Sequence, residues 1–188
     1  MNNKLPYLIT AFGISINVLG GFVATFYDLP IFLNNLGTIL CGLLLGPAGG
    51  ALTGLFSNLI IGSTVNSVYI PFTIVNVVVG FVAGYAAIKH DREFTSMILH
   101  AFLISIIALC LVIPIEMFIF GGPLDQTILS YATTINLNTG LNISAAIYFA
   151  EFPLMIADIV LSAIWAYVVL MLLPKKVLDI LKINNENI

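Results

Sequence analysis

Long apolar stretches with almost no charged residues dominate this chain, and they decide which solvent it can fold in. Hydrophobic residues make up 60% of the 188 positions and charged residues only 8%, whereas soluble domains carry about 25% charged residues. A soluble fold of this length has too small an interior to bury so much apolar surface. We therefore expect an all-α integral membrane protein that crosses the cell membrane several times.

The apolar stretches divide into six segments that we expect to be transmembrane helices. A span needs about 20 apolar residues, and the stretch 29–62 is too long for one. Pro47 and the glycines beside it favour a turn in the middle, so we divide the stretch there. The chain 1–188 is then a single domain with expected helices at about 5–26, 29–46, 48–62, 68–88, 95–119 and 143–173.

The basic residues indicate the orientation of this bundle. They form three groups, and basic residues concentrate on the cytoplasmic side, so each group is expected to face the cytoplasm. The division at Pro47 places an even number of spans between successive groups, so we predict six spans with both termini in the cytoplasm. The groups are Lys4, then Lys89 and Arg92, then Lys175, Lys176 and Lys182.

Under this topology the segment 120–142, between the last two expected helices, is a long outer loop. A loop of this length in a compact protein is often a binding element, and a disordered connector is the alternative. Its apolar content favours packing on the rest of the protein. The apolar side chains concerned are Ile128, Leu129, Tyr131, Ile135 and Leu137.

Small residues recur at every fourth position around Pro47. Helices in lipid associate through close backbone approach at such positions, so the pattern predicts either packing inside the bundle or a face on which another membrane subunit docks. The spacing alone leaves both open. The series consists of Gly42, Gly46, Gly50, Gly54, Asn58 and Gly62, and the first expected helix carries a similar pair, Ala11 and Ser15.

Three carboxylic acids, Glu116, Glu151 and Asp158, lie within the expected spans. An ionised carboxylate at the bilayer centre costs at least about 2.5 kcal/mol, so such a group usually faces a cavity, has a partner or is protonated. No lysine or arginine stands between Arg92 and Lys175. A cavity lined by these acids would favour a cationic or amine-bearing solute. Hydrogen bonds to polar side chains of neighbouring helices are the alternative.

Several kinds of chemistry have no motif here. The segment GPAGGALTG lacks the lysine of a phosphate-binding loop, no G-x-S-x-G occurs, and His90 and His100 have no metal-ligand spacing. The expected cytoplasmic segments are too short for a catalytic domain. We therefore expect a protein that is not an enzyme and that uses no cofactor, resident metal or nucleic-acid partner.

The segment DLPIFLNNLGTILCGLLLGPAGGALTGLFSNLIIG, residues 28–62, resembles the first loop and the second and third helices of a known family. That family is the substrate-binding S components of energy-coupling factor (ECF) transporters, which take up vitamins. FGGPLDQ at 120–126, TGL at 139–141 and LLP at 172–174 are also similar. The resemblance implies a high-affinity binding subunit for a vitamin or vitamin precursor. It also implies a transmembrane coupling subunit and two cytoplasmic ATPases as partners, which drive the S component to tilt and release its cargo.

The resemblance further implies where cargo and partner bind. The family's Ala-x-x-x-Ala docking motif would fall on Ala11 and Ser15, with a serine in place of the second alanine, and the expected docking surface includes Gly50 and Gly54. Asn2 stands where metal-transporting members carry histidine, which argues against a metal cargo. The family's binding regions map onto Asn34, Asn35, Asn76, Glu116, Tyr148, Glu151 and Asp158, of which Glu151 and Asp158 are the strongest candidates for recognising cargo.

Other functions stay open at this point. A stand-alone proton-coupled carrier would use Glu151 or Asp158 as its proton relay. A membrane enzyme would use the acids as its reactive groups. A structural or sensory membrane protein would depend on the glycine faces and not on the carboxylates.

Overall fold

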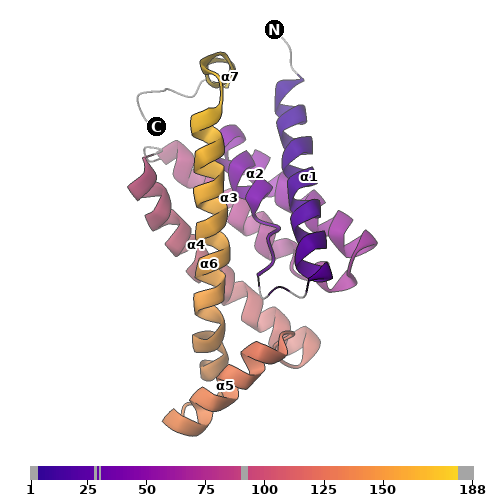
Figure 1. Cartoon of the computed structure of the whole chain (residues 1–188), viewed down its shortest axis with the longest axis vertical. Coiled ribbons are helices and arrows are strands. Elements are labelled where there is room, and N and C mark those ends of the chain that lie inside the picture. Colours follow the sequence, from indigo (N-terminus) through magenta and orange to yellow (C-terminus); the bar gives the residue numbers. More distant parts are fainter. Residues whose placement is uncertain (1–3, 28, 30, 90–92, 182–188) are drawn as a thin grey trace.

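In the computed structural model, residues 4–27, 29, 31–89 and 93–181 are described, and within these ranges every regular element is helical (Figure 1). The basic residues Arg92 and Lys182, together with Asn2 and His90, lie outside the described residues. The elements are α1 (Leu5–Phe26), α2 (Leu36–Thr64), the 3-10 turn η1 (Ser67–Tyr69), α3 (Thr73–Lys89), α4 (Phe94–Ile115), the π-helical turn η2 (Glu116–Phe120), α5 (Gln126–Thr139), α6 (Ile143–Leu172) and α7 (Lys175–Ile180).

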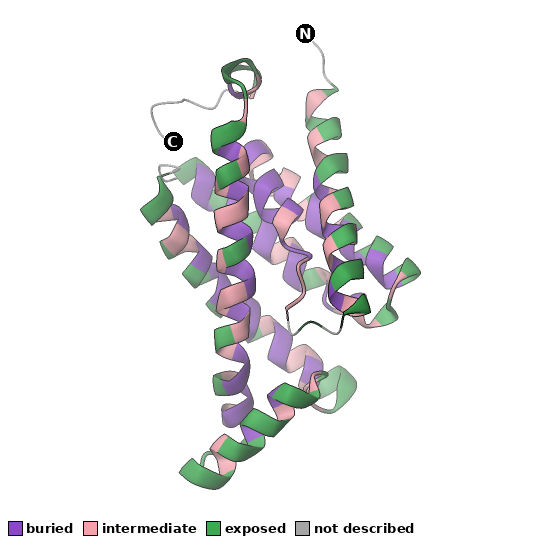
Figure 2. Cartoon of the chain, in the orientation of Figure 1, coloured by how far each residue is buried: buried purple, intermediate pink, exposed green. Residues whose placement is uncertain are grey.

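Among the described residues, four helical segments are long and apolar enough to cross a membrane: α1, α2, α4 together with η2, and α6. Helix α3 is also apolar but shorter. Large hydrophobic side chains are exposed on the outside of these helices, among them Phe12, Leu19 and Leu99, and Figure 2 shows the corresponding exposed strips. The prediction of an all-helical fold is confirmed for the described residues, and these helices are candidate membrane spans.

Helix α2 is two helical segments joined at a sharp reversal. Gly46 has φ of 78° and ψ of −171°, a left-handed backbone conformation that favours glycine, and Pro47 follows with no amide to donate. A Cβ added at Gly50 would lie 2.9 Å from the Cα of Gly42, so the two segments run side by side. The turn expected at Pro47 is therefore present.

The regularly spaced glycines pack inside the molecule, against α3. A Cβ at Gly50 would meet the carbonyl of Gly80, and one at Gly54 would meet the carbonyl of Asn76. Gly84 approaches the backbone of Gly46 in the same way. Close backbone approach brings the two helices into extensive contact. Gly50 and Gly54 are buried in this contact, so they offer no surface to the docking partner expected for them.

Residue 29 and residues 31–35 differ from the expected helix over 29–46. They form an irregular segment, and regular helix begins only at Leu36. Leu33 has φ of 52°, and a Cβ at Gly20 would meet the Leu33 carbonyl oxygen, so α1 passes directly beside this turn. We name residue 29 together with residues 31–35 the inner loop.

The expected outer loop over 120–142 is also different, because most of it forms α5. Asp125 caps this helix by accepting a hydrogen bond of 2.7 Å from the amide of Thr127. Ile128 and Ala132 are buried, and α5 packs on α6. The expected packing is thus present at Ile128, whereas Tyr131 and Leu137 are exposed.

The remaining boundaries agree with expectation to within a few residues. Helices α1 and α6 match the expected 5–26 and 143–173 closely, and α6 continues through Pro153. Helix α3 begins at Thr73 rather than at 68, after η1. Helix α1 begins and α6 ends at one end of the molecule, and α5 lies at the other (Figure 1). We call the α5 end the outer end of the molecule.

Candidate functional site

A cavity of about 510 Å³ lies at the outer end of the molecule, between the inner loop, the first turn of α5 and α6. Its size falls within the range of about 300–1,000 Å³ that is usual for small-molecule sites. The described residues that line it are Leu29, Ile31, Phe32, Glu116, Leu124, Asp125, Gln126, Thr127, Ile128, Glu151, Leu154 and Met155, and no basic residue is among them.

Glu116 and Glu151 form a buried pair in the wall of this cavity. Each side chain is only 2% exposed, and the two carboxyl groups interact with each other. Two carboxylates are both acceptors, so they can hydrogen-bond only when a proton lies between them. Among the described residues, Oε2 of Glu116 and Oε2 of Glu151 have no donor. The pair thus presents unsatisfied acceptors, which a proton or a cationic ligand would satisfy.

The backbone around Glu116 brings it into the cavity wall. α4 ends at Ile115, and Glu116 opens the π-helical turn η2, a type of turn that often occurs at functional sites. The amide of Leu124 donates to Oε1 of Glu116 over 3.4 Å. Asp125, which caps the first turn of α5, adds a third carboxyl group to the lining.

An aromatic row continues from the cavity into the protein. The Phe32 ring lines the cavity and lies 6.3 Å from the Tyr69 ring and 6.3 Å from the Phe72 ring, and Phe72 stacks on Phe120 at 6.0 Å. The Tyr69 hydroxyl contacts Oγ1 of Thr25 at 3.3 Å. Burial raises the pKa of Tyr69, so this hydroxyl stays neutral. Phe32 therefore offers a flat, supported apolar surface to the cavity.

Asp158 lies deeper on α6 and faces the inner loop. Its carboxyl oxygens accept a hydrogen bond of 3.0 Å from the Leu33 amide and one of 2.7 Å from Nδ2 of Asn35. Asp158 is 1% exposed and is absent from the described lining of the 510 Å³ cavity. Its partners are groups of the inner loop.

A network of buried asparagines holds the other side of the inner loop. Oδ1 of Asn58 accepts from Asn34 at 2.9 Å and from Asn76 at 2.6 Å, and Nδ2 of Asn58 donates to the Tyr69 carbonyl at 3.3 Å. Asn17 of α1 similarly joins the two segments of α2, since it donates to Thr38 at 2.8 Å and to Ser57 at 3.0 Å. These amides connect α2 and α3 to the loop and α1 to α2.

The seven predicted cargo residues thus fall in three places. Glu116 and Glu151 line the large cavity. Asn34, Asn35 and Asn76 line a smaller cavity of about 40 Å³, which shares Phe32 and Met155 with the large one. Asp158 and Tyr148 are in neither described lining, and Tyr148 packs against the core.

Sequence reasoning missed several residues of the site. Phe32, Met155 and the first turn of α5 line the cavity without having been singled out. Asn58 was noted only for its place in the series of small residues. One signal was available: Asp125 followed by apolar residues at Ile128, Ala132 and Ile135 is a helix start with a buried face.

Of the expected docking residues, those of α1 are accessible. Ala11 and Ser15 are exposed, and the Ser15 hydroxyl donates to the Ala11 carbonyl at 2.9 Å. The Ser15 hydroxyl is therefore hydrogen-bonded within its own helix. Its small side chain still allows another helix to approach α1 closely, as alanine would.

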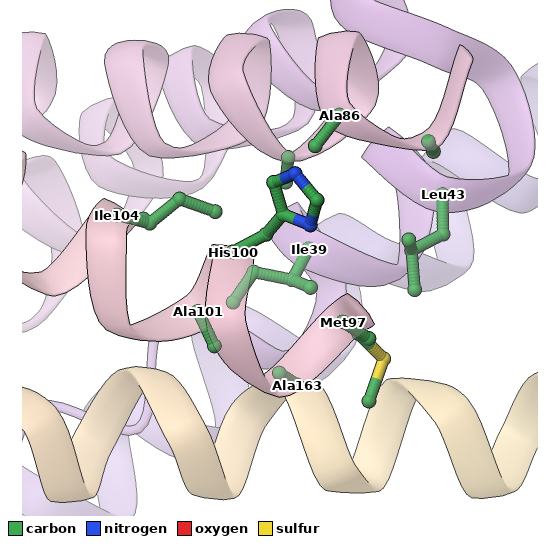
Figure 3. A pocket seen from close by; sticks show the side chains of 10 residues that line it. Ile39, Leu43, Ala86, Met97, His100, Ala101, Ile104 and Ala163 are labelled. Atoms are coloured by element: carbon green, nitrogen blue, oxygen red, sulfur yellow. The ribbon is translucent and has the colours of Figure 1, made fainter. Parts of the chain in front are cut away.

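A third cavity lies near the other end of α4. It encloses about 30 Å³ between α2, α3, α4 and α6, with the His100 ring among apolar side chains such as Ile39, Met97 and Ile104 (Figure 3). Nδ1 of His100 lies 2.6 Å from the Ser96 carbonyl oxygen. Such a volume holds roughly one or two water molecules, so it is no cargo site.

No protein-family model, curated protein or solved structure matches the chain.

Proposed function

We propose that this protein is the substrate-binding S component of an ATP-driven ECF importer, and that its cargo is a small amine-bearing or cationic compound related to a vitamin or vitamin precursor. One observation carries the choice of cargo: a cavity of about 510 Å³ whose described lining contains Glu116, Glu151 and Asp125 but no base. A cation would supply the donors that the Oε2 atoms of both glutamates lack.

The other residues that line the cavity indicate what the rest of the cargo molecule should be like. Leucine, isoleucine and methionine side chains surround the acids, and the Phe32 ring faces the same space. Ligand sites commonly combine such an apolar wall with a few polar groups that orient the ligand. The cargo that fits is therefore an amphiphilic molecule with an ammonium group and an apolar or aromatic part. The function is binding rather than catalysis.

The proposed topology has six spans with both termini in the cytoplasm. The reversal at Gly46 and Pro47 supports it, since it divides α2 into two segments of opposite direction. Lys4, Lys89 and Lys175, one from each basic group, stand where elements begin or end away from the α5 end (Figure 1). This is the distribution that the positive-inside rule requires.

ATP-driven transport would need partners, because the chain carries no phosphate-binding loop motif for ATP. The proposed partners are a transmembrane coupling subunit and two cytoplasmic ATPases. The exposed small residues Ala11 and Ser15 support docking on the α1 face. Uptake by vesicles that hold all four subunits should depend on ATP and stop without the coupling subunit.

The first test is to purify the chain in mild detergent, denature it and identify the released compounds by mass spectrometry. A single stoichiometric ammonium compound is the expected result, and an anionic compound would refute the proposed cargo class. Calorimetry then compares variants for that compound. We expect Glu116→Gln and Glu151→Gln to weaken binding at least about tenfold, the factor for one lost charge-assisted hydrogen bond. Asp179→Asn, which removes an exposed acid on α7, is the matched control and should bind normally.

A second candidate function rests on the carboxyl pair itself. Glu116 and Glu151 would exchange a proton with the cavity in a stand-alone proton-coupled carrier. Vesicles that contain this chain alone distinguish the two functions. Uptake driven by a pH gradient without any ATPase would favour the carrier, whereas no uptake until the coupling subunit and ATPases are added would favour the S component.

A further inference from the structure

We propose that Asp158 is a positioning residue: it fastens the inner loop as a wall of the 510 Å³ cavity and so limits the rate at which a solute enters and leaves. This inference rests on the proposed binding function for its consequence, but the clamp itself is tested below without any cargo. It assigns to Asp158 a role different from the cargo contact expected from the sequence.

The wall and its fastening are different parts of the same short loop. Leu29, Ile31 and Phe32 line the cavity, and the next residues along the chain carry the bonds to Asp158. The Leu33 amide donates to Oδ1 at 3.0 Å, and Asn35 Nδ2 donates to Oδ2 at 2.7 Å. Both carboxyl oxygens are thereby occupied by the loop.

The loop needs such a fastening because its backbone conformation is unfavourable by itself. Leu33 has φ of 52°, a left-handed conformation that is strained for any residue other than glycine. On the α1 side, Gly20 lets the Leu33 carbonyl come closer than any other residue would. Asp158 holds the amide of the same residue from the α6 side. Leu33 is therefore clamped between two helices that are far apart in the sequence.

The clamp also explains why a buried acid is tolerated there without a basic partner. Asp158 is 1% exposed, and buried carboxyl groups are stable when their oxygens are hydrogen-bonded. Glu116 and Glu151, in contrast, keep unpartnered Oε2 atoms in the cavity wall. The three acids thus divide into two that are open to a ligand and one that is used by the loop.

The decisive variant exchanges the carboxyl group of Asp158 and the amide group of Asn35 between the two positions. In Asp158→Asn alone, the Asn35 amide nitrogen faces a second amide and loses a carboxyl acceptor. The double variant combines Asp158→Asn with Asn35→Asp. The amide introduced on α6 then accepts from the Leu33 amide through its oxygen and donates through its nitrogen to the carboxylate introduced in the loop. Both hydrogen bonds and the net charge are restored. Asp158→Ala removes both acceptors, and Ser162→Ala, one helical turn further on α6, is the control.

The first readout is hydrogen–deuterium exchange of the full chain in detergent, without cargo. In Asp158→Ala, amides of residues 31–35 should exchange about tenfold faster, the effect of losing a hydrogen bond to a carboxyl group. Asp158→Asn should give a smaller increase. The double variant and Ser162→Ala should match the unmodified protein. Equal exchange at 31–35 in all variants would overturn the clamp. A uniform increase over α1, α2 and α3, without rescue by the double variant, would reduce Asp158 to a general structural residue and also overturn it.

The second readout measures access to the cavity. Leu154→Cys places a thiol in the cavity lining on α6, in a chain with Cys110→Ser, and a cationic methanethiosulfonate reagent is the probe. We expect modification about tenfold faster when Asp158→Ala is added, in line with the faster opening of the loop. The unmodified rate should return when the two-residue exchange is used instead. Access that does not change with Asp158 would refute the rate-limiting role. Loss of cargo binding in Glu151→Gln is a separate result, so the clamp and the proposed function fail independently.

Discussion

Replacement of Asn58 by leucine is the sharpest test of how this bundle is held together. Asn58 is 1% exposed, and leucine fills a similar volume without any polar group. The substitution removes three hydrogen bonds: those from Asn34 at 2.9 Å and from Asn76 at 2.6 Å, and the one to the Tyr69 carbonyl at 3.3 Å. No water from the bilayer core can replace them.

The size of the effect follows from what those partners lose. Hydrogen bonds between side chains in membrane proteins contribute about 0.6 kcal/mol each on average, which sets a lower bound of about 2 kcal/mol for the three together. Orphaned buried polar groups in soluble proteins cost about 1–3 kcal/mol each. Asn76 keeps a weaker bond of 3.4 Å to the Asn34 carbonyl, so we expect a loss between these bounds, about 2–4 kcal/mol.

The assay is reversible unfolding in mixed micelles by increasing the fraction of sodium dodecyl sulfate, followed by circular dichroism. Ser162→Ala is the control, because its hydroxyl is fully buried and has no partner among the described residues. Removing it should leave the free energy of unfolding unchanged or raise it by up to about 1 kcal/mol. The reasoning is refuted if Asn58→Leu costs less than about 0.5 kcal/mol, or if both variants lose the same amount.

Three further outcomes follow from the packing. Gly80→Ala should lower the free energy of unfolding by about 1–3 kcal/mol, because the new Cβ meets the backbone of α2. This cost should exceed the gain from alanine's better helix propensity. An unchanged free energy of unfolding in the same micelle assay would contradict the close approach of the two helices. Asp125→Ala should cost about 1 kcal/mol in α5, since Thr127 loses its capping bond, and hydrogen exchange should rise in α5 but not in α1. In intact membranes a charged maleimide should label neither Cys41, which is buried, nor Cys110, which is exposed on the outside of α4 and which we expect to face lipid. Both cysteines should react after denaturation. Labelling of Cys110 before denaturation would place that face of α4 in water.

Local pattern predicted the helices whose structure depends on nearby residues. The apolar runs at 5–26 and 143–173 became α1 and α6, and the glycines beside Pro47 became the reversal within α2. These features need only the apolar length of a segment and the conformational limits of proline and glycine. The spacing of Gly42, Gly50 and Gly54 likewise predicted close packing, but it did not say against which helix.

The predicted helix boundaries were wrong where contacts with distant parts of the chain, rather than neighbouring residues, decide the local structure. An apolar run suggested helix from 29 onward, yet residues 31–35 stay irregular. Asp158, far along the chain on α6, and Asn58 and Asn76 satisfy polar groups of Leu33 and Asn34 there. The segment 120–142 was expected to be a loop because it lies between two apolar runs that are each long enough to be a span. It forms α5, since one face packs on α6 and Asp125 supplies the cap.

By itself, the sequence determined that this chain is helical, that its helices are apolar and long enough to be candidate membrane spans, where its turn at Pro47 lies, and that three acids are buried. Only the tertiary structure decided what each acid faces. Glu116 of η2 and Glu151 of α6 meet in the wall of one cavity, whereas Asp158, on the same helix as Glu151, is hydrogen-bonded by the inner loop. The reason is physical: a buried carboxyl group is defined by the donors around it, and those donors come from segments that only folding brings together.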